Sequence, residues 1–141
     1  MVERIAETPI RPIPDAVTQF FWDGVEEGRL LILRCSSCRR FVHPPRSVCR
    51  FCLSEELAPE PVSGQAFLFS WTVATRAFHE FWKDKLPYVL ARVELVEQPG
   101  LRMMTNVVDC SLERLRINLP LQVAFTPVGD PPVVLPLFRP R

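Results

Sequence analysis

From Gly64 onward, the pattern of hydrophobic and polar positions predicts a series of β-strands. Gln65–Arg76 is rich in Phe, Trp, Val and Thr, the residue types that favour strands. Four further segments have the same character: Tyr88–Val96, Leu101–Asp109, Leu121–Thr126 and Val133–Phe138. Turn residues separate them, with a Pro-Gly pair in Glu97-Gln98-Pro99-Gly100 and Gly129-Asp130-Pro131-Pro132 before the last strand.

The order and spacing of these strands predict a barrel. The connection between the third and the fourth, Ser111–Pro120, is polar and long enough for one helical turn. Five strands with one longer connection fit a small Greek-key barrel of the OB type. A half-open five-strand sandwich would produce the same pattern and remains the alternative.

A different periodicity, typical of a helix, precedes the strands. Asp15 is a suitable N-cap, and Gly28 stands where a helix would end. Five residues between them fall on one side at helical spacing: Val17, Phe20, Phe21, Gly24 and Val25. We expect this stripe to pack on the rest of the protein, with docking on a partner as the other interpretation. Met1–Pro14, rich in proline, is expected to be an extended arm.

The remaining segments set the expected division of the chain. Arg29–Arg34 is a short apolar run, Leu53–Ser63 reads as a polar connector, and Ala77–Pro87 as a short helix or lid. We therefore expect an arm and helix over residues 1–28, a metal-binding ribbon over 29–60 and a barrel over 61–141. The predicted fold class is mainly β: an N-terminal helix, a rubredoxin-like zinc ribbon, then a five-stranded OB-type barrel.

Two C-x2-C pairs, Cys35/Cys38 and Cys49/Cys52, predict a metal site. Each pair forms a knuckle that directs two thiolates at one tetrahedral ion, so four thiolates leave no position for water or substrate. The sequence thus predicts one structural zinc ion per chain, with iron as an alternative for the same four sulfurs. Two disulfides or a redox pair are the weaker interpretation, because a cytoplasmic protein keeps its thiols reduced.

Two details qualify the cysteine pattern. Glycine often follows each knuckle, but here Arg39 and Leu53 stand in those places, so we expect slightly distorted knuckles. Cys110, the fifth cysteine, is expected to be a small apolar residue at a strand end rather than a nucleophile.

Composition and missing motifs argue against several classes of function. The net charge is +1, which argues against a nucleic-acid partner. No window reaches the roughly 20 apolar residues of a membrane span, and the N-terminus lacks the features of a signal peptide, so a cytoplasmic location is expected. Phosphate-binding glycine loops, serine-hydrolase elbows and zinc-protease motifs are absent, and His43 and His79 are the only histidines. The sequence therefore predicts a protein without a catalytic site.

Several short motifs, in order, resemble one known family over Asp15–Pro140. The motifs are Phe20-Phe21-Trp22, Glu27-Gly28-Arg29-Leu30, Pro44-Pro45-Arg46, Ser63-Gly64, Pro87-Tyr88-Val89 and Phe138-Arg139-Pro140. They are similar to those of the acyl-CoA-associated OB-fold family with an N-terminal rubredoxin-like zinc ribbon, long catalogued as a domain of unknown function.

The resemblance implies an accessory subunit rather than an enzyme. Members of that family accompany thiolase-like enzymes, including a steroid side-chain aldolase, or are fused to hydratases of the hot-dog fold. It implies an acyl-CoA at or near the shared interface, with Arg46 as the candidate contact for a CoA phosphate. The chain departs from the family in lacking glycine at Arg39, Leu53 and Asn118, although Asn tolerates the left-handed backbone.

Surplus aromatic residues outside the strands are the candidate partner surface. These are Trp22, Phe78, Phe81 and Trp82; filling the space between ribbon and barrel is the alternative. The competing function is a single-stranded nucleic-acid-binding module, with Phe67, Phe69 and Trp71 as stacking platforms. A free-standing acyl-CoA carrier or hydrolase is a third, weaker possibility.

Overall fold

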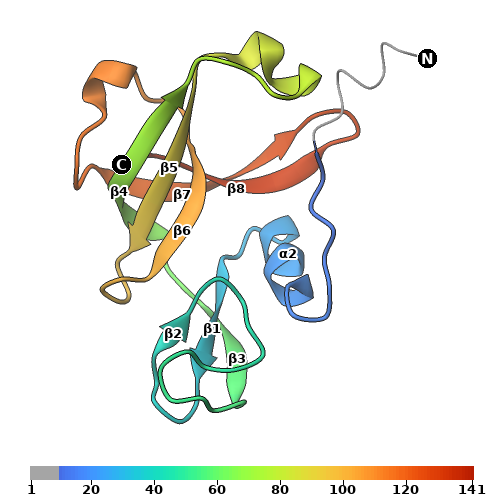
Figure 1. Ribbon diagram of the computed structural model, residues 1–141, viewed down its shortest axis with the longest axis vertical. Coiled ribbons are helices and arrows are strands. Elements are labelled where there is room, and N and C mark those ends of the chain that lie inside the picture. Colours follow the sequence, from blue (N-terminus) through green and yellow to red (C-terminus); the bar gives the residue numbers. More distant parts are fainter. Residues whose placement is uncertain (1–9) are drawn as a thin grey trace.

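The computed structural model describes residues 10–141 and arranges them as a helix, a small three-stranded sheet and a closed barrel (Figure 1). Most of the expected arm, Met1–Pro14, therefore lies outside the described residues. In Figure 1 the helix α2 lies between the small sheet and the β7–β8 side of the barrel. It packs against β1 of the sheet and β8 of the barrel.

Helix α2 spans Gln19–Glu26 and is preceded by a turn that Asp15 caps. The Asp15 carboxylate accepts the amides of Val17 and Thr18 at 3.0 and 2.9 Å, which satisfies donors that a helix start leaves unpaired. Gly28, with φ +72°, ends the helix: its amide donates to Val25, and the Arg29 amide donates to Gly24. This is a Schellman motif, so the predicted helix end at Gly28 is confirmed. The start is not, because the α-helix begins at Gln19 and Asp15 caps only the turn before it.

The three-stranded sheet has the order β2-β1-β3, formed by Phe41–Val42, Leu31–Cys35 and Leu57–Pro61. The expected polar connector over Leu53–Ser63 is wrong at β3, which pairs antiparallel with β1. In the sequence, Pro59 and Pro61 argued against a strand, because proline has no N–H to donate to a neighbouring strand. The Val62 amide donates to Leu30, so strand alternation turns Pro59 and Pro61 to the open edge, where a missing N–H costs nothing.

The barrel closes in the order β4-β5-β6-β8-β7. The strands are Gln65–Ala74, Tyr88–Leu95, Arg102–Val107, Val133–Pro140 and Pro120–Val128, in that order. All neighbours are antiparallel except β6 and β8, which meet in parallel. β4 closes against β7 over Gln65–Phe67, with a bulge between Leu68 and Ser70. This topology confirms the OB-type barrel and excludes the half-open sandwich.

Two short 3₁₀ helices complete the chain. Helix η1, Glu80–Lys85, forms within the segment expected to be a short helix or lid, and η2, Leu112–Arg114, within the connection between the third and fourth barrel strands. Asn118 adopts φ +62°, as expected of a residue that replaces glycine there. Its amide donates to Leu68 at 2.9 Å and holds the connection against β4.

Helix, ribbon and barrel share one apolar core. Its buried members include Phe21 and Val25 of α2, Ile32 and Phe41 of the ribbon, and Phe138 of the barrel. The β5–β6 turn also clamps the ribbon, because Gln98 accepts the Phe41 amide at 2.8 Å and donates to the Phe41 carbonyl at 3.1 Å. The stability of the ribbon and that of the barrel are therefore coupled.

Candidate functional site

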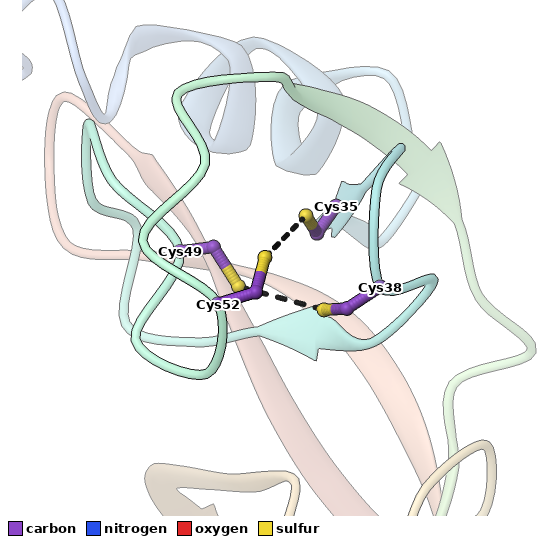
Figure 2. Close-up of side chains that lie close together, drawn as sticks. All are labelled: Cys35, Cys38, Cys49 and Cys52. Carbon is purple, nitrogen blue, oxygen red and sulfur yellow. Dashed lines mark hydrogen bonds between the residues drawn. The ribbon is translucent and has the colours of Figure 1, made fainter.

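Figure 2 shows the four cysteines of the two knuckles turned toward one centre. Cys35 ends β1, Cys38 follows in the turn before β2, and Cys49 and Cys52 come from the loop before β3. Their four sulfur atoms all lie within 4.8 Å of one another. Cys35 and Cys49 are fully buried, while Cys52 lies at the surface.

The sulfur separations fit a tetrahedral ion. A Zn–S bond of about 2.3 Å places two ligands of a tetrahedron about 3.8 Å apart. Cys35 and Cys52 are 3.6 Å apart, and Cys38 and Cys49 are 3.7 Å apart. A disulfide would require about 2.05 Å. The donor set and its geometry therefore suit zinc, and no disulfide joins these residues.

Backbone amides lower the pKa of two of these four thiols, Cys35 and Cys49. The amide of Cys38, followed by that of Ser37, lowers the pKa of Cys35 to about 6. Burial raises the pKa of Cys49, but the amides of Phe51 and Cys52 outweigh it and the net shift is downward. The Ser54 amide favours the Cys52 thiolate, yet burial and the other three sulfurs raise the pKa of Cys52 to about 11. Cys52 would therefore lose its proton near neutral pH only if a cation were bound among the four sulfurs, because a nearby positive charge favours the thiolate.

The knuckles form without glycine. Arg39 and Leu53 adopt φ +63° and +64°, the left-handed conformation that glycine would adopt freely. Their amides donate to Cys35 and Cys49, both at 2.9 Å, which closes each knuckle turn. The hydrogen bonds that close both knuckle turns therefore have normal lengths, without the distortion expected there. The cost of lacking glycine is instead a strained backbone at Arg39 and Leu53.

Replacing Leu53 with glycine should raise the free energy of unfolding by about 1 kcal/mol, because it relieves a left-handed L-residue. The Leu53 side chain is 77% exposed, so its removal costs little packing. Leu53→Ala is the matched control: it removes the same contacts but keeps the strain. Chemical denaturation of the zinc-loaded proteins measures both, and equal stability of the two variants would contradict the strain at this position.

His43 joins the ribbon to the helix. Its ring lies 5.8 Å from that of Phe21, and burial lowers the pKa of the imidazole to about 4. The imidazole ring is therefore neutral at pH 7, which suits its buried contact with the Phe21 ring. Neither His43 nor His79 belongs to the cysteine cluster, which is the only group of three or more metal-ligating side chains among residues 10–141.

The structure separates the four aromatic residues expected at a partner surface. Phe81 of η1 is only 3% exposed, and Lys85 lies over its ring, so this side chain is not available to a partner as the structure stands. Phe78 is 91% exposed. Trp82 contacts the rings of Phe81 and Tyr88, and Trp22 packs on Phe21.

Trp22 and Trp82 line two separate hollows on the surface. The first, of about 560 Å³, lies between α2, the His43-Pro44-Pro45 loop of the ribbon, and strands β6 and β8. We call it the ribbon-end hollow. The second, of about 610 Å³, lies between η1 and the barrel and is lined by Trp82, Lys85 and Cys110 among others. We call it the η1-end hollow.

Arg46 lines neither hollow. It is exposed, and it makes no hydrogen bond or ion pair with any residue in the described part of the chain. Three other arginines line the ribbon-end hollow instead: Arg50, Arg92 and Arg102. Sequence analysis missed them because they come from a ribbon loop and two different strands, and no local motif unites them.

Comparison with known proteins identifies the family. The zinc-ribbon segment, residues 22–58, matches the family model described as "ChsH2, rubredoxin-like zinc ribbon domain", and residues 59–126 match "ChsH2, C-terminal OB-fold domain". A DUF35 domain-containing scaffold protein of Methanothermobacter thermautotrophicus is 32% identical over 69% of this chain and 71% of its own length. The chain belongs to the ChsH2/DUF35 family. The resemblance drawn from the sequence motifs is thereby confirmed.

Two further relatives show the range of this family. A probable enoyl-CoA hydratase alpha subunit of Thermomonospora curvata is 32% identical over 92% of this chain, but the chain spans only 39% of that relative's length. A solved structure described as an Ltp2–ChsH2(DUF35) aldolase matches 92% of this chain and 98% of its own, with 32% identity and a TM-score of 0.81.

A more distant structure supports the fold alone. It is a DUF35-family protein of unknown function from Sulfolobus solfataricus, 17% identical, with a TM-score of 0.62 over 89% of this chain and 86% of its own. Within residues 10–141, no helix of this protein has the length and apolar character needed to span a bilayer.

Proposed function

We propose that this protein is a non-catalytic accessory subunit of an acyl-CoA-processing complex, and that it docks on a thiolase-like enzyme. The observation that carries the proposal is the match, over nearly the whole ribbon and barrel, to the ChsH2(DUF35) chain of an aldolase that also contains Ltp2. The relatives described as a scaffold protein and as a hydratase subunit point in the same direction. A cytoplasmic complex acting on steroid or other lipid side chains is the specific form that we favour.

The chemistry of the site supports a structural role for the metal. Four cysteine sulfurs close the coordination sphere, so we assign one structural zinc ion to each chain. The hollows contain no nucleophile–base pair: Cys110 lines the η1-end hollow, but its sulfur donates only to the Ser111 carbonyl, at 3.4 Å. Acyl-CoA would then be held jointly with the partner, with Arg46 as one candidate for a phosphate contact.

The test is co-purification of the tagged protein from its native host, followed by mass spectrometry. A thiolase-like or hydratase subunit recovered in near-equal amount would support the proposal and identify the pathway. Recovery of the protein alone would overturn it.

Trp82→Ala should weaken this complex by about tenfold or more while the zinc remains bound. Trp82 lines the η1-end hollow, and large aromatic residues dominate the energy of interfaces. Figure 1 places η1 and the zinc ribbon at opposite ends of the molecule, which is why metal content should not change. Affinity measurements and zinc analysis check both statements, with Ile117→Ala, an exposed residue outside both hollows, as control. Unchanged affinity of Trp82→Ala would remove Trp82 from the interface.

Nucleic-acid binding is the second candidate. Phe67 and Phe69 on β4 are 38% and 39% exposed, as stacking platforms would have to be. The net charge of +1 weighs against it, because neutralising a phosphate backbone requires an excess of cations. Salt-dependent binding of a single-stranded oligonucleotide would favour this function over the first.

A further inference from the structure

The two hollows meet along the seam between β6 and β8. Asn106 of β6 and Leu137 of β8 line both of them. The seam is open because the two strands pair only at Val107 and Phe138. Beyond that pair, a side-chain bond from the Thr105 hydroxyl to the Pro136 carbonyl, at 2.8 Å, holds the strands together. The two hollows are therefore neighbours on this side of the barrel, with Asn106 and Leu137 between them.

The ribbon-end hollow is walled mainly by apolar side chains from all three parts of the protein. These include Trp22 of α2, Pro44 and Pro45 of the ribbon, and Met104, Leu135 and Leu137 of the barrel. Met104 is 57% exposed, an unusual position for a large apolar side chain. Because three parts build one surface, its shape exists only when the zinc ribbon is folded against the barrel.

The charges at this hollow have one sign. Arg50, Arg92 and Arg102 line it, and no Asp or Glu does. Arg102 is partly neutralised by Glu94, at 3.0 Å, and lies over the Phe69 ring at 3.6 Å. Arg92 forms no ion pair with any residue between 10 and 141. A molecule that fits this surface would therefore present an apolar group beside a negative charge.

The apolar surface continues beyond the hollow. Leu90, 39% exposed, lies opposite Asn106 in the β5–β6 register, and Phe69 lies on the neighbouring strand under Arg102. A small ligand within the hollow would leave these side chains in water, whereas a protein surface would cover them together.

We propose that the ribbon-end hollow, with the exposed β5 and β6 side chains beside it, receives an extended segment of the partner subunit. That segment carries aliphatic or aromatic side chains and at least one carboxylate, which pairs with Arg92. This inference rests on the proposed function for the existence of the partner, and it adds where the partner docks and what the docking segment contains.

Two pairs of matched substitutions test it. Met104→Asp places a charge in the hollow. Its control, Ile117→Asp, places the same charge outside both hollows, at a residue that is 58% exposed compared with 57% for Met104. Arg92→Glu reverses the unpaired charge, and Arg116→Glu reverses an exposed arginine outside both hollows. Zinc content and thermal unfolding establish that all four variants are folded.

The measurement is the Kd of each full-length variant for the purified thiolase-like subunit that co-purifies with the wild type, at low and high salt. We expect Met104→Asp and Arg92→Glu to raise Kd by about thirtyfold or more, the effect of losing a central interface residue, and the controls by no more than about threefold. Salt should weaken the wild-type complex more than the Arg92→Glu complex.

The outcomes separate this inference from the proposed function. If the wild type binds the subunit and the hollow variants bind as well as their controls, the docking site is wrong and the accessory function stands. If no thiolase-like subunit binds the wild type, both fall. A wild-type dimer that Met104→Asp dissociates would assign the hollow to a second copy, and oligonucleotide binding that Arg92→Glu abolishes would assign it to nucleic acid; either result overturns the proposal.

Discussion

Cys49→Ser should abolish zinc binding and lower the free energy of unfolding by about 4 kcal/mol or more, because metal ligation contributes directly to the folding of such small modules. For a chain of this size, that corresponds to a fall of about 12 °C in the melting temperature. Cys49 is fully buried and packs with Leu33, Cys35 and Val42 at the centre of the ribbon. That cluster has too little apolar surface to hold the ribbon by itself.

The effect should extend beyond the ribbon. Ile32 and Phe41 belong to the core shared with the barrel, so a ribbon without metal exposes part of that core. Metal analysis by mass spectrometry and thermal unfolding followed by circular dichroism measure the two expected changes. Cys110→Ser is the control, since Cys110 lies outside the cysteine cluster and should leave both zinc content and melting temperature nearly unchanged. A Cys49→Ser protein that keeps stoichiometric zinc and wild-type stability would contradict the structural role of the site.

Gly64→Ala should cost about 3 kcal/mol, the second-largest effect that we expect from a single substitution. Gly64 stands just before β4 with φ +73°, where an L-residue is strained. A Cβ atom there would lie 2.3 Å from Cγ1 and 3.2 Å from Cβ of Val123. The Gly64 carbonyl also accepts the Val123 amide at 2.9 Å, so the backbone cannot move away without losing a bond that closes the barrel.

Gly100→Ala separates the two causes. Gly100 has φ +80°, but a Cβ atom there would meet nothing within 4 Å. We expect this variant to lose only about 1 kcal/mol, the cost of the left-handed conformation alone. Urea denaturation of both variants gives the comparison. Equal losses would mean that Val123 yields to the added methyl group and that close packing at Gly64 is unimportant.

The barrel strands could be predicted because their signals are local. Runs of β-branched, aromatic and other apolar residues between turn residues marked the five strands, and a Pro-Gly turn marked the β5–β6 hairpin. The missed strand, β3, shows the limit of such signals. Pro59 and Pro61 usually exclude a strand, and only the pairing with β1 shows that both lie on an open edge.

Arg39 and Leu53 show a second limit. Their side chains disfavour the left-handed backbone, and the sequence alone therefore indicated distorted knuckles. In the folded ribbon both residues adopt the left-handed backbone, and each amide closes its knuckle turn. Local preference therefore did not decide the conformation of either turn.

The sequence by itself determined the four-cysteine cluster, the five-stranded barrel and the family of the protein. Each of these depends on residues close together in the chain, or on motifs whose order is preserved. Only the tertiary structure decided where the surfaces for a ligand or a partner lie. Phe81 is buried, Arg46 stands apart, and Trp22, Arg92 and Met104 come together from a helix and two strands. Long-range packing of the ribbon against the barrel creates that hollow, and no pattern of neighbouring residues encodes it.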